Sequence, residues 1–306
     1  VHSGSTESAL EGFARAGALA DELFAEELIE PSLVVGVRGS WAVALRDAWR
    51  YDEAEALLEE TLTLQRRLHL GARQRGRLLG NLGELQSFLG RHDDARETLL
   101  AALEALEKAY PDEVPRARSY LGDLERRAGD PVAAAQHFDA GLEANHRVQT
   151  GAAANEAFLR YGRARLRLER GAHRAALDDL EVMLSLPLGT SLYPGRRALA
   201  LRGRCRLALA TDEKERAAGI EDLQRAGDEV ADGGPLVRFA CKLAHGTLAQ
   251  ELLRDDPVAH HGRILELVDG LATAAEAAGG PPGELALALR ELSSRLPESA
   301  PEVMVT

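Results

Sequence analysis

Arginine is the residue type in this sequence that is best suited to chemistry. Lysine occurs only at Lys108, Lys214 and Lys242, so 34 of the 37 basic side chains are guanidinium groups. A guanidinium carries five N–H donors in a planar fork, and it captures a carboxylate or a phosphate through paired, charge-assisted hydrogen bonds. Anion recognition is therefore the most abundant chemistry on offer, and it depends on the elements that bring the arginines together.

Sequence signatures of catalysis are missing. No lysine follows a glycine, which excludes a Walker A phosphate loop, and the motifs HExxH, CxxC and GxSxG do not occur. Two adjacent aspartate pairs, at 178–179 and 255–256, could suggest acid–base chemistry. Neighbouring side chains on a helix diverge by about 100°, so these pairs are better explained by solvation or helix capping. We expect no enzyme activity, no catalytic residue and no cofactor.

The cysteines and histidines allow one metal hypothesis. Cys205 and Cys241 are the only cysteines, and each lies in a helical apolar pattern typical of a buried free thiol in a reducing cytoplasm. Cys241 and His245 share a helix face, and with His260 and His261 they could bind zinc if all four converged. A core cysteine with surface histidines is the simpler interpretation, so we predict no metal site.

Charge and hydropathy exclude several classes of partner. The net charge is −12 and the isoelectric point is near 5.3, which argues against a nucleic-acid or anionic-membrane binder. No apolar run reaches 18 residues, and the first ten residues lack the pattern of a signal peptide. We therefore expect a cytoplasmic protein. Val1 is either a GTG start or the cut end of a longer chain, and the sequence leaves both open.

The apolar residues predict helices. Alanine and leucine dominate, isoleucine occurs three times and aromatic residues make up 4% of the chain. Alanine, leucine, arginine and glutamate are strong helix formers, whereas strands favour β-branched and aromatic residues. The composition therefore indicates an all-α protein.

Helical segments repeat along the chain. Four similar stretches occupy 51–62, 92–103, 131–142 and 173–184, and a looser fifth copy follows at Gly219. Their anchor residues Ala54, Ala95, Ala134 and Ala176 are spaced by 41, 39 and 42 residues. A second helical segment precedes each copy, so the repeating unit is a helix–turn–helix.

These repeats predict a single domain over 1–306. An N-terminal helix (5–30) within the lead-in 1–35 is followed by six antiparallel pairs over 36–279, and 280–306 hold a capping helix (282–296) and a tail. The expected pairs are 36–50/52–68, 73–89/92–109, 113–128/131–147, 151–170/173–186, 194–211/213–231 and 235–253/257–279. The expected buried residues are Leu58, Leu82, Leu99, Ala102, Leu121, Phe138, Leu142, Leu180, Leu184 and Leu223.

The unit resembles the tetratricopeptide repeat, in a long-repeat bacterial type, over roughly 36–279. The residues that carry the resemblance are Leu79, Leu82, Gly83, Gly90, Ala95, Leu99 and Ala102 in repeat two, and Leu121, Gly122, Gly129, Ala134 and Phe138 in repeat three. Trp49 stands where repeat one should have its turn glycine. The resemblance implies a right-handed superhelical solenoid, in which the first helix of each pair lines a concave groove.

Charge alternates along the predicted pairs. Every first helix carries a net positive charge and every second helix a net negative one. The segment 194–211 is the extreme case, with five arginines and no acidic residue. Combined with the geometry implied by the resemblance, this predicts a basic groove on an acidic body. The alternative is that these arginines neutralise the neighbouring acidic helices within the fold.

The predicted function is to bind a protein or peptide partner, as a scaffold or adaptor that takes an acidic segment in the groove. The residues expected to line it are Arg77, Asn81, Arg116, Arg127, Arg163, Arg165, Arg202 and Arg206. Asn81 and Arg116 match two positions of the carboxylate clamp of some tetratricopeptide proteins, whereas Tyr120, Gly39 and Val43 do not. The alternative function is a peptide-sensing regulatory arm of a larger signalling protein, of the kinase or transcription-regulator type.

Overall fold

The structure is a computed structural model that describes residues 4–148, 152–187, 193–228 and 235–255, with residues 260, 262–264 and 266–268. Twelve α-helices and no β-strand occur among these residues, which confirms the all-α class. The helices are α1 (Gly4–Ala25), α2 (Pro31–Asp47), α3 (Tyr51–Arg67), α4 (Ala72–Phe88), α5 (His92–Glu107), α6 (Val114–Ala128), α7 (Pro131–Asn145), α8 (Ala152–Glu169), α9 (His173–Ser185), α10 (Tyr193–Leu209), α11 (Glu213–Gly227) and α12 (Pro235–Asp255).

A left-handed residue follows α2, α4, α6 and α8. Trp49, Gly90, Gly129 and Gly171 have φ angles of 63°, 76°, 83° and 71°. In each turn the N–H of this residue bonds to the carbonyl three residues back, and the next N–H bonds to the carbonyl five residues back. This Schellman motif satisfies carbonyls at the end of the helix and leads the chain into the next one. Trp49 occupies the turn position that glycine holds elsewhere, as the sequence predicted.

Small residues bring the helices of a pair close together. A Cβ on Gly83 would lie 2.6 Å from Leu99 Cγ, and a Cβ on Gly122 would lie 2.6 Å from the Phe138 ring. These distances are far shorter than a van der Waals contact, so the large side chains of α5 and α7 pack directly against the backbone of the preceding helices. The anchor residues Ala54, Ala95, Ala134 and Ala176 are fully buried.

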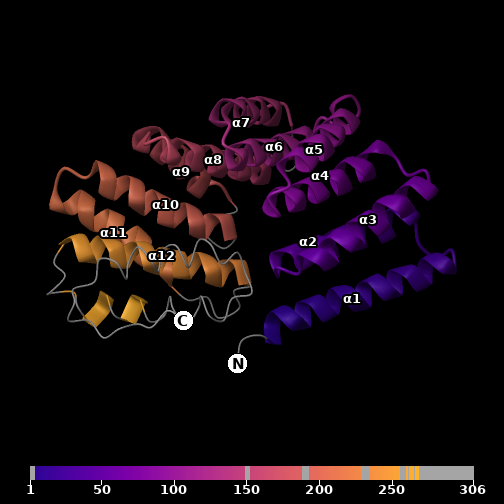
Figure 1. Cartoon of the computed structure of the whole chain (residues 1–306), viewed down its shortest axis with the longest axis horizontal. Helices are drawn as coiled ribbons and strands as arrows, with labels where there is room; N and C mark the ends of the chain where they lie inside the picture. Colours follow the sequence, from indigo (N-terminus) through magenta and orange to yellow (C-terminus); the bar gives the residue numbers. More distant parts are fainter. Residues whose placement is uncertain are drawn as a thin grey trace. The chain divides into compact units, whose positions relative to one another are not determined.

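The chain divides into two compact units. The N-terminal unit comprises Val1–Ala172 with Ser185–Leu188, and it contains α1 to α8 as antiparallel neighbours, of which Figure 1 shows α1 to α4 side by side. In this unit α2 contacts α4, α4 contacts α6 and α6 contacts α8, whereas no comparable contact joins α3 to α5 or α5 to α7. Helices on the inside of a curved stack approach one another most closely. The first helices of the pairs therefore line the inner face of this unit.

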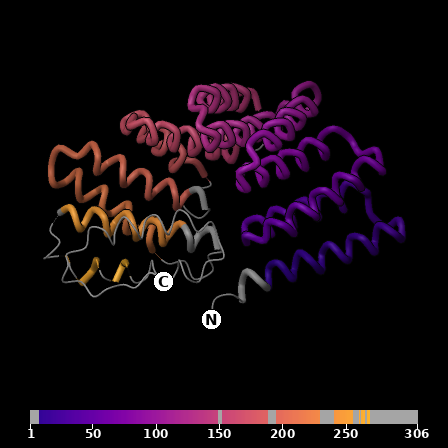
Figure 2. Tube along the Cα trace, in the orientation of Figure 1, coloured from indigo at the N-terminus to yellow at the C-terminus, as the bar shows by residue number. Residues whose placement is uncertain are grey.

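The C-terminal unit comprises His173–Leu184 with Gly189–Thr306. Within it α10 packs on α11, α11 packs on α12 and α10 also contacts α12, which are the neighbouring salmon and orange helices in Figure 2. Gly203 and Gly219 let α10 and α11 meet at their backbones, because a Cβ on either would lie 2.8–3.0 Å from the other's carbonyl oxygen. Among the described residues no helix is long and apolar enough to cross a membrane.

Most predicted elements are found within a few residues of their expected ends. The exceptions are at the start, where α1 ends at Ala25 rather than 30 and α2 begins at Pro31 rather than 36. Proline favours the first turn of a helix, which explains the earlier start of α2. The segments 257–279 and 282–296 lie largely outside the described residues, and the single domain over 1–306 stays a prediction.

The predicted burial of one core residue is wrong. Leu184 is only half-buried, and Met183 occupies the interior in its place. The helix ends at Ser185, so position 184 lies at its frayed end, whereas the equivalent Leu142 lies three residues before the end of α7. The other nine predicted core residues are buried.

Candidate functional site on the inner face of the N-terminal unit

The turn residues align the first helices with one another. Counted back from Gly90, Gly129 and Gly171, the same four positions recur on one face of each helix. We call these positions the inner stripe: Arg77, Asn81, Glu84 and Phe88 on α4, then Arg116, Tyr120, Asp123 and Arg127 on α6, then Phe158, Gly162, Arg165 and Glu169 on α8. All of them except Gly162 are exposed or half-buried. The stripe is therefore the accessible side of the helices that line the inner face.

Ion pairs within the stripe join successive first helices. Arg46 on α2 pairs with Glu84 on α4 and, at 2.8 Å, with its neighbour Asp47. Burial alone would lower the pKa of Arg46, but Glu84 and Asp47 more than offset it and raise that pKa above its usual value. This first group therefore holds two carboxylates for one guanidinium, and Glu84 also acts to raise the pKa of Arg116 and of Arg127.

Three guanidinium groups surround Asp123. Its carboxylate lies 3.1 Å from Arg126, 3.8 Å from Arg127 and 3.6 Å from Arg165. Although burial alone would raise the pKa of Asp123, these guanidinium groups hold it below its ordinary value. Glu169 pairs with Arg126 at 2.7 Å and is the second carboxylate of the group. One carboxylate, that of Asp123, thus serves three guanidinium groups.

Arg127 is the arginine of this group whose charge is least compensated. Burial lowers the pKa of Arg127, and Asp123 only partly offsets that effect while Arg165 and Arg126 add to it. Its guanidinium lies 4.2 Å from the centroid of the Phe88 ring and donates to the hydroxyl of Ser87 at 3.0 Å. A cation whose pKa falls on burial is incompletely compensated, and an added anion would stabilise it.

Arg116 is the most available cation of the stripe. It is exposed, its Nε donates to the hydroxyl of Tyr120 at 2.7 Å, and it forms no ion pair with any carboxylate in the described part of the chain. Burial raises the pKa of Tyr120, so the phenol stays neutral and can donate its own proton to a ligand. Asn81 is half-buried on α4, the neighbouring first helix, and its side chain makes no hydrogen bond to a described residue.

Phe88 belongs to the site, although the sequence analysis did not select it. It is 44% exposed at the end of α4, and Arg127 and Arg46 approach its ring at 4.2 and 6.0 Å. The repeat spacing could have identified it, because Phe88 on α4 occupies the position that the predicted groove residue Arg127 occupies on α6. An exposed ring held by two cations can take the apolar part of a ligand.

The predicted groove residues fall into three groups. Arg77, Asn81, Arg116, Arg127 and Arg165 lie together on the stripe of the N-terminal unit, where Arg77 also pairs with Glu113 at the start of α6.

Arg163 lies off the stripe and pairs with Asp139 of α7 at 2.6 Å. Arg202 and Arg206, in the C-terminal unit, bind Asp222 of α11 at 2.6 and 3.0 Å. The role of these eight residues in partner binding stays a prediction.

The candidate metal residues do not form a cluster in the described part of the chain. Cys241 Sγ donates to the Asp228 carbonyl at 3.4 Å, the ring of His245 lies against Gly227, and His261 lies outside the described residues. Cys205 and Cys241 are both buried free thiols, as predicted, and burial raises the pKa of Cys205 to about 11.

Comparison with known proteins agrees with this geometry. The sequence model of the tetratricopeptide repeat family matches residues 37–108, which extend from α2 to the end of α5. Residues 37–108 belong to the tetratricopeptide repeat family. The turn residues of the chain recur every 39 to 42 residues, so its repeats are longer than the usual 34. Comparison with curated proteins gives no match.

Solved structures extend the likeness to most of the chain. BtubC (BKLC) from P. vanneervenii is 18% identical with a TM-score of 0.55, over 72% of this chain and 89% of its own. Yeast Tom70 is 13% identical with a TM-score of 0.54, over 94% of this chain and 60% of the yeast chain. A tetratricopeptide repeat protein from Parabacteroides merdae is 16% identical with a TM-score of 0.51, over 94% and 98%.

These likenesses establish the fold, an α-helical solenoid of antiparallel pairs. The tetratricopeptide fold generally mediates protein–protein interaction, and proteins of this family are typically non-enzymatic scaffolds.

Proposed function

We propose that the inner face of the N-terminal unit binds an acidic segment of a partner protein, and that the chain acts as a scaffold or adaptor without a catalytic step. The observation that carries this proposal is the state of two arginines of the inner stripe. Arg116 has no carboxylate partner among the described residues, and burial lowers the pKa of Arg127 because Asp123 and Glu84 offset it only in part. An added carboxylate would pair with Arg116 and stabilise the charge of Arg127.

The energies favour a carboxylate over a neutral segment. A hydrogen bond to a charged group contributes about 1.5–3 kcal/mol, and a bidentate arginine–carboxylate contact is among the strong ones. Arg116 offers such a contact with little rearrangement, since its present partner is the neutral phenol of Tyr120. Phe88 and Tyr120 add aromatic surface beside these cations, so the preferred segment carries apolar residues between its acids.

Helix spacing sets the spacing of the acids. Packed helices lie about 8–10 Å apart, and the first helices α4, α6 and α8 contact one another in turn. An extended chain advances about 3.3 Å per residue, so three residues span the distance between the stripe positions of two neighbouring first helices. The proposal therefore favours an extended segment with an acidic residue at about every third position.

The acidic body adds selectivity. With a net charge of −12, the protein as a whole repels anions at long range, so an acidic segment is favoured only where arginines gather. Such a field steers acidic segments to the basic face and weakens with salt, because the Debye length is about 8 Å at physiological ionic strength. Association should accordingly slow as salt rises.

Site-specific photocrosslinking tests the location and the chemistry together. A benzoylphenylalanine in place of Phe88 puts the probe on the stripe, and the same probe in place of Leu100 puts it on α5 with similar exposure, 48% against 44%. In extract of the source cells, the Phe88 probe should crosslink a protein, and mass spectrometry should map the crosslink to an acidic segment. Arg116→Glu should abolish that crosslink, and Arg147→Glu, the same charge change at an exposed site, should not.

Two results would overturn the proposal. One is equal crosslinking of the same protein from Leu100, which would move the contact to the outer helices. The other is a crosslink that maps to a basic or uncharged segment, or that disappears on nuclease treatment, which would exclude an acidic protein ligand.

A further inference from the structure

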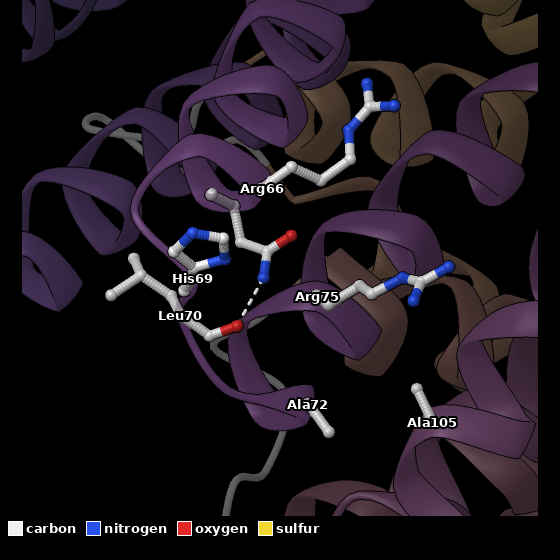
Figure 3. Close-up of a pocket in the computed structure, with 7 residues that line it drawn as sticks. Arg66, His69, Leu70, Ala72, Arg75 and Ala105 are labelled. Carbon is white, nitrogen blue, oxygen red and sulfur yellow. Dashed lines mark hydrogen bonds between the residues drawn. The ribbon is translucent and has the colours of Figure 1, made fainter.

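A second cationic site lies where α3, α4 and α5 meet, at residues separate from the inner stripe. Figure 3 shows this open pocket, which has a volume of about 430 Å³. Arg66, His69 and Arg75 supply its polar wall, and Leu70, Ala72 and Ala105 supply its apolar wall. Of the described residues that line it, none is acidic, although the protein carries a net charge of −12.

Within the described part of the chain, the two arginines of the pocket form no ion pair. The hydrogen bonds of Arg66 to described residues lie within its own helix, to the Leu62 carbonyl and the Thr63 hydroxyl, each at 3.3 Å. Arg75 is exposed and forms no ion pair with any residue in the described ranges. This contrasts with Arg73 and Arg77 on the same helix, which bind Asp112 and Glu113.

The start of α4 adds to the positive potential. Gly71 is the N-cap residue and provides no side-chain cap, and the first turn contains no acidic residue. The first N–H groups of a helix without a side-chain cap are available to an anion, and the helix dipole favours one there. Ala72, at the start of this helix, lines the pocket.

Gln65 provides an independent indication of a ligand. The residue is 4% exposed, and its Nε2 donates to the Leu70 carbonyl, which is the dashed bond in Figure 3. This bond fixes the amide orientation and leaves Oε1 buried without a hydrogen-bond partner. An unsatisfied buried oxygen costs about 1–3 kcal/mol, so a ligand that brings an N–H donor to it is favoured.

His69 is held in a costly conformation beside these groups. Its φ is 48°, in the left-handed region where the turns after α4, α6 and α8 use glycine. A left-handed conformation costs a residue with a Cβ about 1–2 kcal/mol. The N–H of His69 bonds to the Arg66 carbonyl and the N–H of Leu70 bonds to the Gln65 carbonyl, so this is the same Schellman turn as at Trp49. The turn places the imidazole in the wall of the pocket.

We propose that this pocket binds a phosphorylated side chain of a partner protein. The phosphate accepts hydrogen bonds from Arg66, Arg75 and the first turn of α4, and a backbone N–H of the same segment donates to Gln65 Oε1. A phosphate has three terminal oxygens and nearly two charges, so it can satisfy two guanidinium groups and a helix start at once, which a carboxylate cannot. The proposal rests on the proposed function only in taking a protein as the partner.

The test uses a small probe of this chemistry. N-acetyl-phosphoserine N-methylamide carries both the phosphate and the N–H groups, whereas ethyl phosphate and inorganic phosphate lack the N–H. The Ala72 and Ala105 methyl groups line the pocket, so ¹³C-methyl alanine labelling of the whole chain reports binding, with the two signals assigned from Ala72→Ser and Ala105→Ser. The phosphoserine probe should shift both signals and bind more tightly than ethyl phosphate.

Matched variants locate the contacts. Arg66→Gln and Arg75→Gln should each weaken the phosphoserine probe about tenfold, which is the loss expected for one charge-assisted contact. Arg67→Gln, the neighbouring exposed arginine outside this pocket, should leave the affinity within twofold. Gln65→Met, which keeps the volume, should remove the preference for the phosphoserine probe over ethyl phosphate.

Three outcomes would overturn the proposal. No shift of the two methyl signals at about 10 mM probe means that the pocket is not a phosphate site. Equal affinity for the phosphoserine probe and inorganic phosphate means a site for free phosphate. If Arg67→Gln weakens the affinity for the phosphoserine probe as much as Arg66→Gln and Arg75→Gln do, the probe is held by general charge attraction. The Arg66 and Arg75 variants leave the inner stripe intact, and Arg116→Gln leaves the pocket intact, so the two proposals fail separately.

Discussion

The arginines of the first helices do different work in the two units. In the C-terminal unit, Arg202 and Arg206 bind Asp222, which is 2% exposed on the second helix α11. In the N-terminal unit, Arg127 and Arg165 share Asp123, which lies on a first helix. An arginine with its carboxylate on the second helix braces a pair, whereas arginines between first helices are the ones that we propose for ligand binding. Neutralisation of an acidic second helix, the alternative drawn from the sequence, therefore describes Arg202 and Arg206, and the binding role of Arg127 and Arg165 stays a prediction.

Removing the buried carboxylate should have the largest effect on stability. Asp222→Asn leaves Arg202 and Arg206, both largely buried, without their main counter-charge, and breaking a buried pair in this way costs about 3 kcal/mol. Urea unfolding followed by circular dichroism should show this loss. Glu221→Gln, an exposed neighbour on the same helix, should change the free energy of unfolding by less than about 0.5 kcal/mol. Equal effects of the two variants would mean that Asp222 is not a brace.

Asp123→Asn should cost less and should change the pH dependence. The Asp123 side chain is 24% exposed, compared with 2% for Asp222, so the expected loss at pH 7 is about 2 kcal/mol. Its pKa is below the usual carboxyl value when folded, so its contribution is present above about pH 4 and disappears as the pH falls through the folded pKa. The stability of the wild type should therefore fall more steeply below pH 5 than that of the variant.

Asp123→Asn should also strengthen the binding of an acidic peptide. This result would show that Asp123 competes with the ligand for the arginines and does not act through packing alone. Removing the Asp123 carboxylate leaves Arg126, Arg127 and Arg165 with one anion less. Affinity for an acidic peptide should rise although stability falls. A fall in both would contradict the account of Asp123 as a competitor of the ligand.

Phe88→Leu should have the smallest effect on stability. The ring is 44% exposed, and its contact with Arg127 at 4.2 Å contributes about 0.5–1 kcal/mol at such a site. Phe158→Leu is the matched control, because Phe158 is 49% exposed on the same stripe and no arginine among the described residues stacks on its ring. Thermal unfolding should show a larger loss for Phe88→Leu. The opposite order would mean that the ring does not compensate Arg127.

The helices were predictable because their signals are local. These signals are the alanine and glycine anchors, a glycine or Trp49 in the turns after α2, α4, α6 and α8, and prolines such as Pro131 at a helix start. Each acts through neighbouring residues. The observed ends of α3 to α8 therefore lie within three residues of the ends predicted from the sequence. Leu184 failed because burial at the end of a helix depends on what packs there.

The partner of each arginine was not predictable from the repeats. Arg163 and Arg165 differ by about 200° around α8, so one reaches Asp139 of α7 and the other reaches Asp123 of α6. That choice depends on how the helices cross, which the repeats do not determine. Phe88 was missed for a related reason, since only the structure shows that its ring is exposed.

The affinity of an acidic peptide for the Arg116→Gln variant tests the central claim most directly. The probe is a fluorescein-labelled peptide with glutamate at every third position, measured by anisotropy at low and physiological salt. Arg116→Gln should weaken binding about tenfold and leave the free energy of unfolding unchanged, because Arg116 is exposed and has no carboxylate partner among the described residues. Arg147→Gln, an exposed arginine beyond the end of α7, should leave the affinity within twofold. Unchanged binding in Arg116→Gln, or equal loss in both variants, would contradict the account.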